Sequence, residues 1–167
     1  LLSEKFGTLP FNKIKKGGRS GIAVSGISYP YLTEVIREFG LDLTVFKVGT
    51  PYPIPTKPAE EFLSLVDRVL VIEELDPVIE EQLLILSAGK KEILGKMTAH
   101  LPCNGEYSFE LIRDAVLKFA CVRSEDLPMA EIPVLPVRPP VLCAGCPHRA
   151  SFYAAKTAAK NFEKTVY

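Results

Sequence analysis

The sequence lacks most of the features that mark a specialised class of protein. Its 20 basic and 20 acidic side chains cancel, so no large field of one sign draws it to nucleic acid. No apolar run approaches the roughly 20 residues that a membrane-spanning helix needs. Four cysteines at irregular spacing do not form a disulfide framework in a chain of 167 residues. We therefore expect no nucleic-acid partner, no membrane partner, and a reducing, cytoplasmic setting.

Glycine-rich phosphate motifs are also missing. The chain has no G-x-G-x-x-G and no Walker-type lysine loop. Its first strand–helix turn, SGISYP, contains a single glycine. Ser25 and Ser28 leave a flavodoxin-like phosphate loop open, but Ser28 as the cap of the following helix is the stronger interpretation.

A regular alternation of strand and helix patterns is present instead. Short apolar runs predict strands at 21–26, 43–48, 68–74 and 92–96. Apolar residues at helical spacing predict helices at 28–40, about 58–66, 77–86 and 108–120. The alternation predicts an α/β fold, a three-layer sandwich with a mostly parallel sheet. The continuous apolar run at 21–26 predicts that this strand is central.

Proline and glycine positions divide the chain into four parts. Residues 1–20 are expected to be an entering linker, and residues 21–126 the α/β domain. The five prolines within 127–141 predict a stiff linker. Residues 142–167 then begin a second unit that is too short to bury a core alone.

Few residues of the α/β domain are candidates for chemistry. Glu73 and Glu74 lie at the C-terminal end of the strand at 68–74, where α/β folds place ligands, so they are candidates for acid–base work. A solvated strand end or an interface contact is the stronger interpretation. His100 is expected to be structural, and Cys103 and Cys121 are expected to be buried, inert thiols.

The stretch VLCAGCPHRASFY at 141–153 carries the densest set of reactive side chains. Cys143 and Cys146 have three interpretations. A zinc site needs about four ligands, and the spacing here is not that of a zinc finger. A redox dithiol is favoured at a helix N-terminus, and a helical pattern follows, but a proline linker replaces the preceding strand. The third interpretation is half of an iron–sulfur site, which takes four thiolates.

These residues also carry a family resemblance. RPPVLCAGCPHRASFYA at 138–154 resembles a signature of indolepyruvate:ferredoxin oxidoreductase alpha subunits, in which it opens the thiamine-diphosphate-binding domain. Further stretches are similar to the preceding domain of that family, in the same order: PFNKI (10–14), IAVSGISYPYL (22–32), VGTPYPIP (48–55), VLVIEELDPVIEEQL (69–83) and GKMTAHLPCNGE (95–106).

The resemblance implies a function for the parent enzyme. That family oxidatively decarboxylates arylpyruvates to aryl-acetyl-CoA with thiamine diphosphate, magnesium, coenzyme A and [4Fe-4S] clusters, and passes electrons to ferredoxin. Its alpha subunit pairs with a beta subunit. Residues 21–126 would match a domain similar to the transketolase C-terminal domain, which serves assembly, and self-association through it is possible.

The resemblance also implies roles for single residues. Cys143 and Cys146 would be iron–sulfur ligands in the full enzyme, and His148 and Arg149 would lie near thiamine or the carboxylate of the substrate. The chain lacks the family's pyrimidine-binding domain, diphosphate motif and cysteine-rich tail. We therefore expect an internal fragment that binds no cofactor and is inactive alone. The alternative is a free-standing thiol redox or binding module that uses Cys143 and Cys146.

Overall fold

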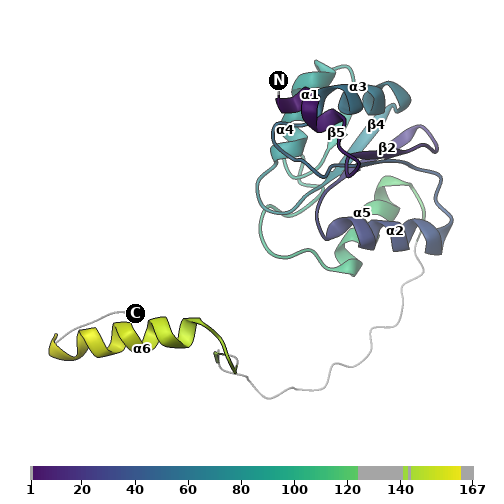
Figure 1. Cartoon of the computed structure of the whole chain (residues 1–167). Helices are drawn as coiled ribbons and strands as arrows, with labels where there is room; N and C mark the ends of the chain where they lie inside the picture. Colours follow the sequence, from purple (N-terminus) through teal and green to yellow (C-terminus); the bar gives the residue numbers. More distant parts are fainter. Residues whose placement is uncertain (1, 124–140, 143, 163–167) are drawn as a thin grey trace. The chain divides into compact units, whose positions relative to one another are not determined.

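The computed structural model describes residues 2–123, 141–142 and 144–162, and Figure 1 shows their helices and strands. By its internal contacts the chain divides into two units, Leu1–Asp126 and Leu127–Tyr167. No helix in the described ranges has the length and apolar content needed to cross a membrane.

The first unit alternates strands and helices along the chain. Its elements are α1 (Leu2–Gly7), β1 (Lys13–Lys15), β2 (Ser20–Val24), α2 (Ser28–Phe39), β3 (Thr44–Lys47), α3 (Thr56–Leu65), β4 (Arg68–Ile72), α4 (Val78–Ser87), β5 (Glu92–Leu94) and α5 (Phe109–Phe119). The second unit contributes α6 (His148–Ala158) and the 3₁₀ turn η1 (Ala159–Asn161).

The strands form one sheet in the order β1-β3-β2-β4-β5. β2 pairs in parallel with β3 and with β4, and β4 pairs in parallel with β5. The predicted α/β class, the mostly parallel sheet and the central place of the first predicted strand are therefore confirmed. Only β1 runs antiparallel, beside β3 at the sheet edge.

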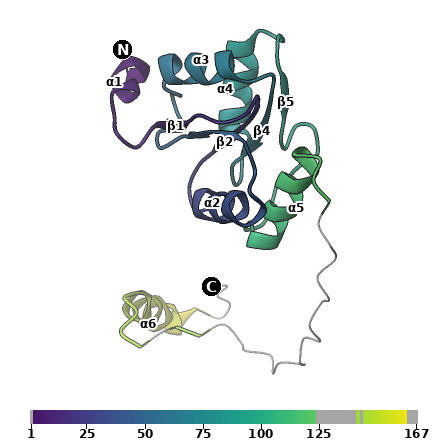
Figure 2. The same cartoon turned by 90° about the vertical axis from the view of Figure 1, so that its right-hand side faces the viewer.

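Helices cover both faces of this sheet and enclose two apolar cores. Figures 1 and 2 show α2 and α5 side by side on one face and α3 and α4 on the other. Alternate residues of each strand point into opposite cores: on β2, Ile22 and Val24 face α2 and α5, whereas Ala23 faces α3 and α4. Because the central strands are buried on both faces, they read as continuous apolar runs.

Residues 1–20, expected as an entering linker, contain α1 and β1. Asn12 ties this stretch to the domain: its side chain donates to the carbonyl of Phe6 (2.9 Å) and accepts from the amides of Gly49 (2.8 Å) and Thr50 (3.2 Å). Within β1 only Ile14 is apolar, between two lysines, so the alternation that predicts a strand is too short to detect.

The helix ends differ in detail from the expected caps. Ser28 does not cap α2, because Ile27 holds the cap position and makes no side-chain cap bond. Pro77 holds the cap position of α4, also without a side-chain cap bond. Ser108 does cap α5, and its hydroxyl accepts from the amide of Leu111 at 3.2 Å. α2 ends at Gly40, which adopts the left-handed conformation with φ of 59°.

Candidate functional site

The candidate site around the Cys-x-x-Cys stretch is built on the start of α6. Gly145 has φ of +78°, a conformation that glycine adopts at no steric cost, and it turns the chain into the helix. The amide of Arg149 donates to the carbonyl of Cys146 at 3.1 Å, which closes the first turn. Cys146 therefore stands immediately before a helix N-terminus, and the prediction that a helix follows it is confirmed.

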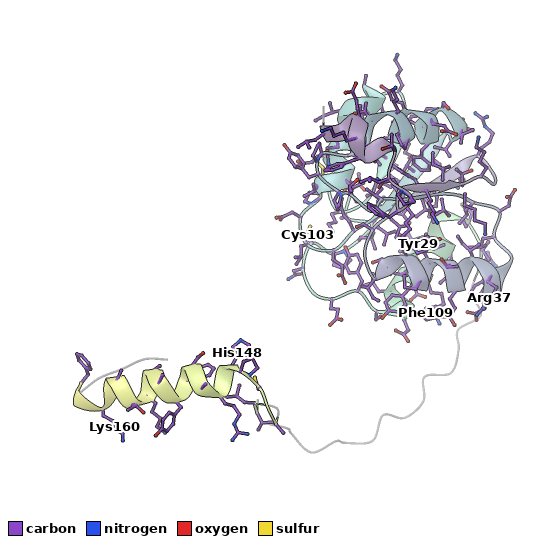
Figure 3. The ribbon with its side chains drawn as sticks, viewed as in Figure 1. Tyr29, Arg37, Cys103, Phe109, His148 and Lys160 are labelled. Carbon is purple, nitrogen blue, oxygen red and sulfur yellow. The ribbon has the colours of Figure 1, made fainter. Side chains whose placement is uncertain are left out.

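Cys146 and His148 lie in contact at this turn. The Cys146 Sγ is 3.3 Å from the His148 Nδ1, and the cysteine is half-buried while the histidine is exposed. Figure 3 shows His148 at the beginning of α6. Arg149 is exposed beside it. Cys143 lies outside the described residues, so the predicted Cys143–Cys146 pair stays a prediction.

The described residues offer only part of a metal-ligand set. Cys103 and Cys121, expected to be buried, are both exposed. Across ranges 2–123, 141–142 and 144–162, no three His, Cys, Asp or Glu side chains come together as a metal site would require. An iron–sulfur cluster takes about four thiolates and zinc about four ligands. A complete cluster therefore does not fit the described side chains alone.

Glu73 and Glu74, the acid–base candidates, hold the backbone of neighbouring loops. Glu73 is buried, and its two carboxylate oxygens accept the amides of Ile79 (2.8 Å) and Glu80 (2.9 Å) at the start of α4. Burial raises the pKa of the Glu73 carboxyl above its ordinary value, in spite of these two hydrogen bonds. Glu74 accepts the amide of Tyr107 at 2.9 Å. Neither carboxylate is a free acid–base group, and Glu73 is not a solvated strand end.

A second buried carboxylate continues this network and was not singled out by the sequence. Glu80 is fully buried, and its Oε2 accepts the amides of Lys96 (2.8 Å) and Met97 (3.3 Å). A Cβ at Gly95 would lie 2.5 Å from that oxygen, so only glycine permits this approach. The sequence offers one weak signal: Glu80 lies three residues before Leu83, so it shares a helical face with an apolar residue.

Lys96 and Tyr107 extend the contacts that Glu73, Glu74 and Glu80 make with neighbouring loops. The Lys96 ammonium donates to the carbonyl of Leu75 and lies 5.4 Å from the centre of the Tyr107 ring. The Tyr107 hydroxyl donates to the carbonyl of Pro102 at 2.7 Å. Together with the carboxylates, these contacts fix the loops after β4 and β5, which is a structural role rather than a catalytic one.

The remaining candidates make local contacts. The His100 ring Nδ1 lies 2.9 Å from the Thr98 hydroxyl and 3.1 Å from the Thr98 carbonyl, and the side chain is exposed. Ser28 is fully buried, and its hydroxyl has no hydrogen-bond partner in the described structure.

Three relatives of this chain in sequence carry the same name. It is 37% identical over 158 residues to the indolepyruvate oxidoreductase subunit IorA of Methanothermobacter thermautotrophicus, and this match covers 91% of the chain and 25% of the relative. IorA of Methanothermobacter marburgensis is 39% identical over 144 residues, covering 84% of the chain and 23% of the relative. IorA of Archaeoglobus fulgidus is 37% identical over 159 residues, covering 90% and 25%.

The chain is homologous to one part of the IorA subunit. It spans about a quarter of the length of the IorA relatives it matches. No protein-family model matches it. In structure it is similar to a split-gene transketolase solved as an inactive beta4 tetramer, with a TM-score of 0.50 at 14% identity over 70% of this chain and 45% of that one. This likeness supports a fold of the type seen in the transketolase C-terminal domain.

Proposed function

We propose that this chain is part of an oxidoreductase that oxidatively decarboxylates arylpyruvates such as indolepyruvate to aryl-acetyl-CoA, with ferredoxin as electron acceptor. The observation that carries the proposal is the 37% identity to IorA over 91% of the chain. The parent enzyme would use thiamine diphosphate, magnesium, coenzyme A and [4Fe-4S] clusters and would pair with a beta subunit.

Within that enzyme the α/β unit would serve assembly. The candidate carboxylates Glu73 and Glu74 are engaged by backbone amides, and His100 contacts its own loop, so these candidates offer no nucleophile–base pair there. A rigid domain without such a pair suits the joining of subunits or domains, including association with a second copy of itself.

The stretch before and within α6 would serve the redox centre. Cys143 and Cys146 would supply two of the about four thiolates of a cluster. A helix N-terminus favours nearby negative charge, which suits the thiolate ligand at Cys146. Arg149, exposed on the first turn, would bind the carboxylate of the 2-oxoacid, since a guanidinium binds carboxylates with two parallel hydrogen bonds. His148 would lie near thiamine or substrate.

To test this proposal, the longer protein encoded by the extended reading frame is produced anaerobically together with its beta subunit. We expect indolepyruvate-dependent reduction of ferredoxin. Replacement Cys146→Ala should remove about one cluster's worth of iron and change the electron-paramagnetic-resonance spectrum. Replacement Arg149→Met should raise the KM for indolepyruvate and leave the iron content intact, whereas Lys156→Met on the same helix should do neither. Unchanged iron in the Cys146 variant would contradict the ligand role.

The contact between the Cys146 sulfur and the His148 ring, at 3.3 Å, favours a second candidate. An adjacent imidazole activates a thiol, so Cys143 and Cys146 would form the dithiol of a free-standing redox or binding module. Two observations distinguish these two functions: the redox behaviour of the 167-residue chain and the reading frame after it. A dithiol that cycles reversibly with a glutathione buffer, together with a stop codon after Tyr167, supports the module.

A further inference from the structure

A groove of about 270 Å³ lies between α2 and the strands β1 and β3. It belongs to the α/β unit and plays no part in the function proposed above. The residues that line it are Lys13, Ile14, Lys15, Tyr29, Thr33, Ile36, Val45 and Lys47. We call it the lysine groove, because three of its eight lining residues are lysines.

Strand register explains why the lysines share one wall. In the antiparallel pair, Lys13 lies opposite Lys47, and Lys15 lies opposite Val45. Residues directly opposite each other in such a pair point to the same face of the sheet. Val45 belongs to the core under α2 and α5, so the three lysines stand on the face that α2 covers.

The apolar part of the groove comes from the same face. Val45 is buried and Ile36 of α2 is half-buried against the same core. Tyr29 stands at the start of α2, as Figure 3 shows, and Arg37 stands towards its other end. The Lys47 ammonium lies 4.7 Å from the centre of the Tyr29 ring, a cation–π contact that holds this lysine at the wall.

Among the described residues, the three positive charges of the groove have no acidic partner. Within the part of the chain that the structure describes, no carboxylate lies within ion-pair distance of Lys13, Lys15 or Lys47. The neighbouring Lys16 is paired, with its ammonium 3.2 Å from Glu61. Like charges that gather around one hollow repel one another, so an anion in the groove would relieve that repulsion.

Protection of the sheet edge accounts for only part of this arrangement. Lysines on an edge strand discourage pairing with other chains, and Lys13 and Lys15 lie on the edge strand β1. Lys47 lies on β3, which is flanked by β1 and β2 and has no free edge. A hollow with an apolar floor is not needed for edge protection either.

We propose that the lysine groove binds a small phosphate-bearing ligand. Three ammonium groups match a group that carries two negative charges in a small volume, as a phosphate ester does, better than a single carboxylate. The apolar floor at Val45 and Ile36 suits a short chain or a single ring attached to the phosphate. The volume of about 270 Å³ is at the small end for ligand pockets, which excludes a large cofactor as the occupant of the groove alone.

The test is a titration of the full 167-residue chain with inorganic pyrophosphate, followed by two-dimensional NMR of the backbone amides. We expect saturable shifts confined to amides of β1, β3 and the first turns of α2, with a Kd of about 1 mM or tighter. Ribose 5-phosphate, a phosphate ester of suitable size, should give the same pattern, and ribose alone should give none.

Variants separate the groove from general surface charge. The double variant Lys13→Met with Lys47→Met should raise the Kd about tenfold or more, because it removes two of three charges. Lys16→Met, a change of the same kind next to the groove, should change it by less than about twofold. The amide spectrum of each variant reports whether the domain remains folded.

Three results would overturn the proposal. One is the absence of shifts at ten times the expected Kd. Another is an equal loss of binding in the Lys16 variant, which would show that general surface charge, and not the groove, attracts the anion. The third is binding of an acidic extended peptide along β1 without any response to pyrophosphate, which would make the lysines part of a peptide-binding edge.

Discussion

Helices α2 and α6 are nearly equal in length, 12 and 11 residues, but they differ in what they bury. α2 places three residues in the interior, Ser28, Leu32 and Val35, whereas α6 has no buried residue. The large apolar residues of α6 stay in contact with solvent: Phe152 is 52% exposed and Tyr153 is 75% exposed. Helical spacing of apolar residues thus predicts both helices equally well, but it does not tell whether a helix has a partner to cover its apolar face.

This difference separates the two units by what holds them together. Most helical stability in proteins comes from packing of an apolar face rather than from the helix itself. α2 has that packing, against the sheet and α5. α6 relies on its own hydrogen bonds and on the turn at Gly145. The chemistry proposed for Cys146, His148 and Arg149 therefore sits on the less buried of the two units.

The largest effect is expected when a phenylalanine is replaced by alanine in each unit, which tests whether only the α/β unit depends on buried packing. Phe62 is fully buried and packs against Phe46, with ring centres 5.5 Å apart. Phe62→Ala should lower the free energy of unfolding of the α/β unit by about 3–5 kcal/mol, because it removes the ring and leaves a cavity. Phe152→Ala should change it by less than about 0.5 kcal/mol, since Phe152 is about half exposed and lies in the other unit.

Urea denaturation followed by circular dichroism measures both variants. The chain contains no tryptophan, so tyrosine fluorescence provides a second probe of the same transition. A loss of similar size in the two variants would mean that Phe152 is part of a stabilising core, contrary to the comparison.

The sequence predicts the sheet well because its central strands are simple. The segments at β2 and β4 are short, continuously apolar and bounded by polar or glycine residues, so they allow one interpretation. The continuous apolar run of the first predicted strand then predicts its central place, because a strand buried on both faces carries apolar residues on both sides. Strand β1 is not predicted, because it is held by long-range contacts such as that of Asn12 with Gly49. Such contacts leave no local pattern in the sequence.

The candidate site was predictable in part only. Cys146, His148 and Arg149 are adjacent in the chain, so their gathering at one helix start needs no tertiary information. Glu73, Glu80 and Lys96 belong to separate segments, and each is buried because a backbone group from another loop meets it. A charged residue is rarely buried unless it is paired, so the charge of these three residues predicts that they lie at the surface.

Glu80 and Glu81 allow a buried and an exposed carboxylate to be compared within helix α4. Glu80→Ala should destabilise the α/β unit by about 2 kcal/mol, because the amides of Lys96 and Met97 lose their acceptor in the interior. Glu81→Ala removes the same side chain from the exposed face of α4 and should cost less than about 0.5 kcal/mol. Thermal unfolding of both variants is the measurement, and equal melting temperatures would show that Glu80 does not hold the loop after β5.

The smallest expected effect compares two tyrosines and depends on pH. Tyr107 is 2% exposed and Tyr153 is 75% exposed. Tyr107→Phe should cost about 1 kcal/mol near pH 8, because it removes the hydrogen bond to the Pro102 carbonyl, whereas Tyr153→Phe should leave the α/β unit unchanged.

Burial, followed by nearby acidic groups including Cys103 and Glu73, raises the pKa of Tyr107 from 10.0 to about 12. Between these values the unfolded chain releases the phenol proton and the folded chain keeps it, so the stability that Tyr107 contributes falls as the pH rises. We therefore expect the difference in unfolding free energy between the wild type and Tyr107→Phe to shrink above pH 10 and to change sign before pH 12, because the loss over this range exceeds about 1 kcal/mol. Urea denaturation at each pH measures this difference. A difference that stays constant across this range would mean that Tyr107 titrates alike in the folded and unfolded chain, and its buried hydroxyl would then be no different from the exposed one on α6.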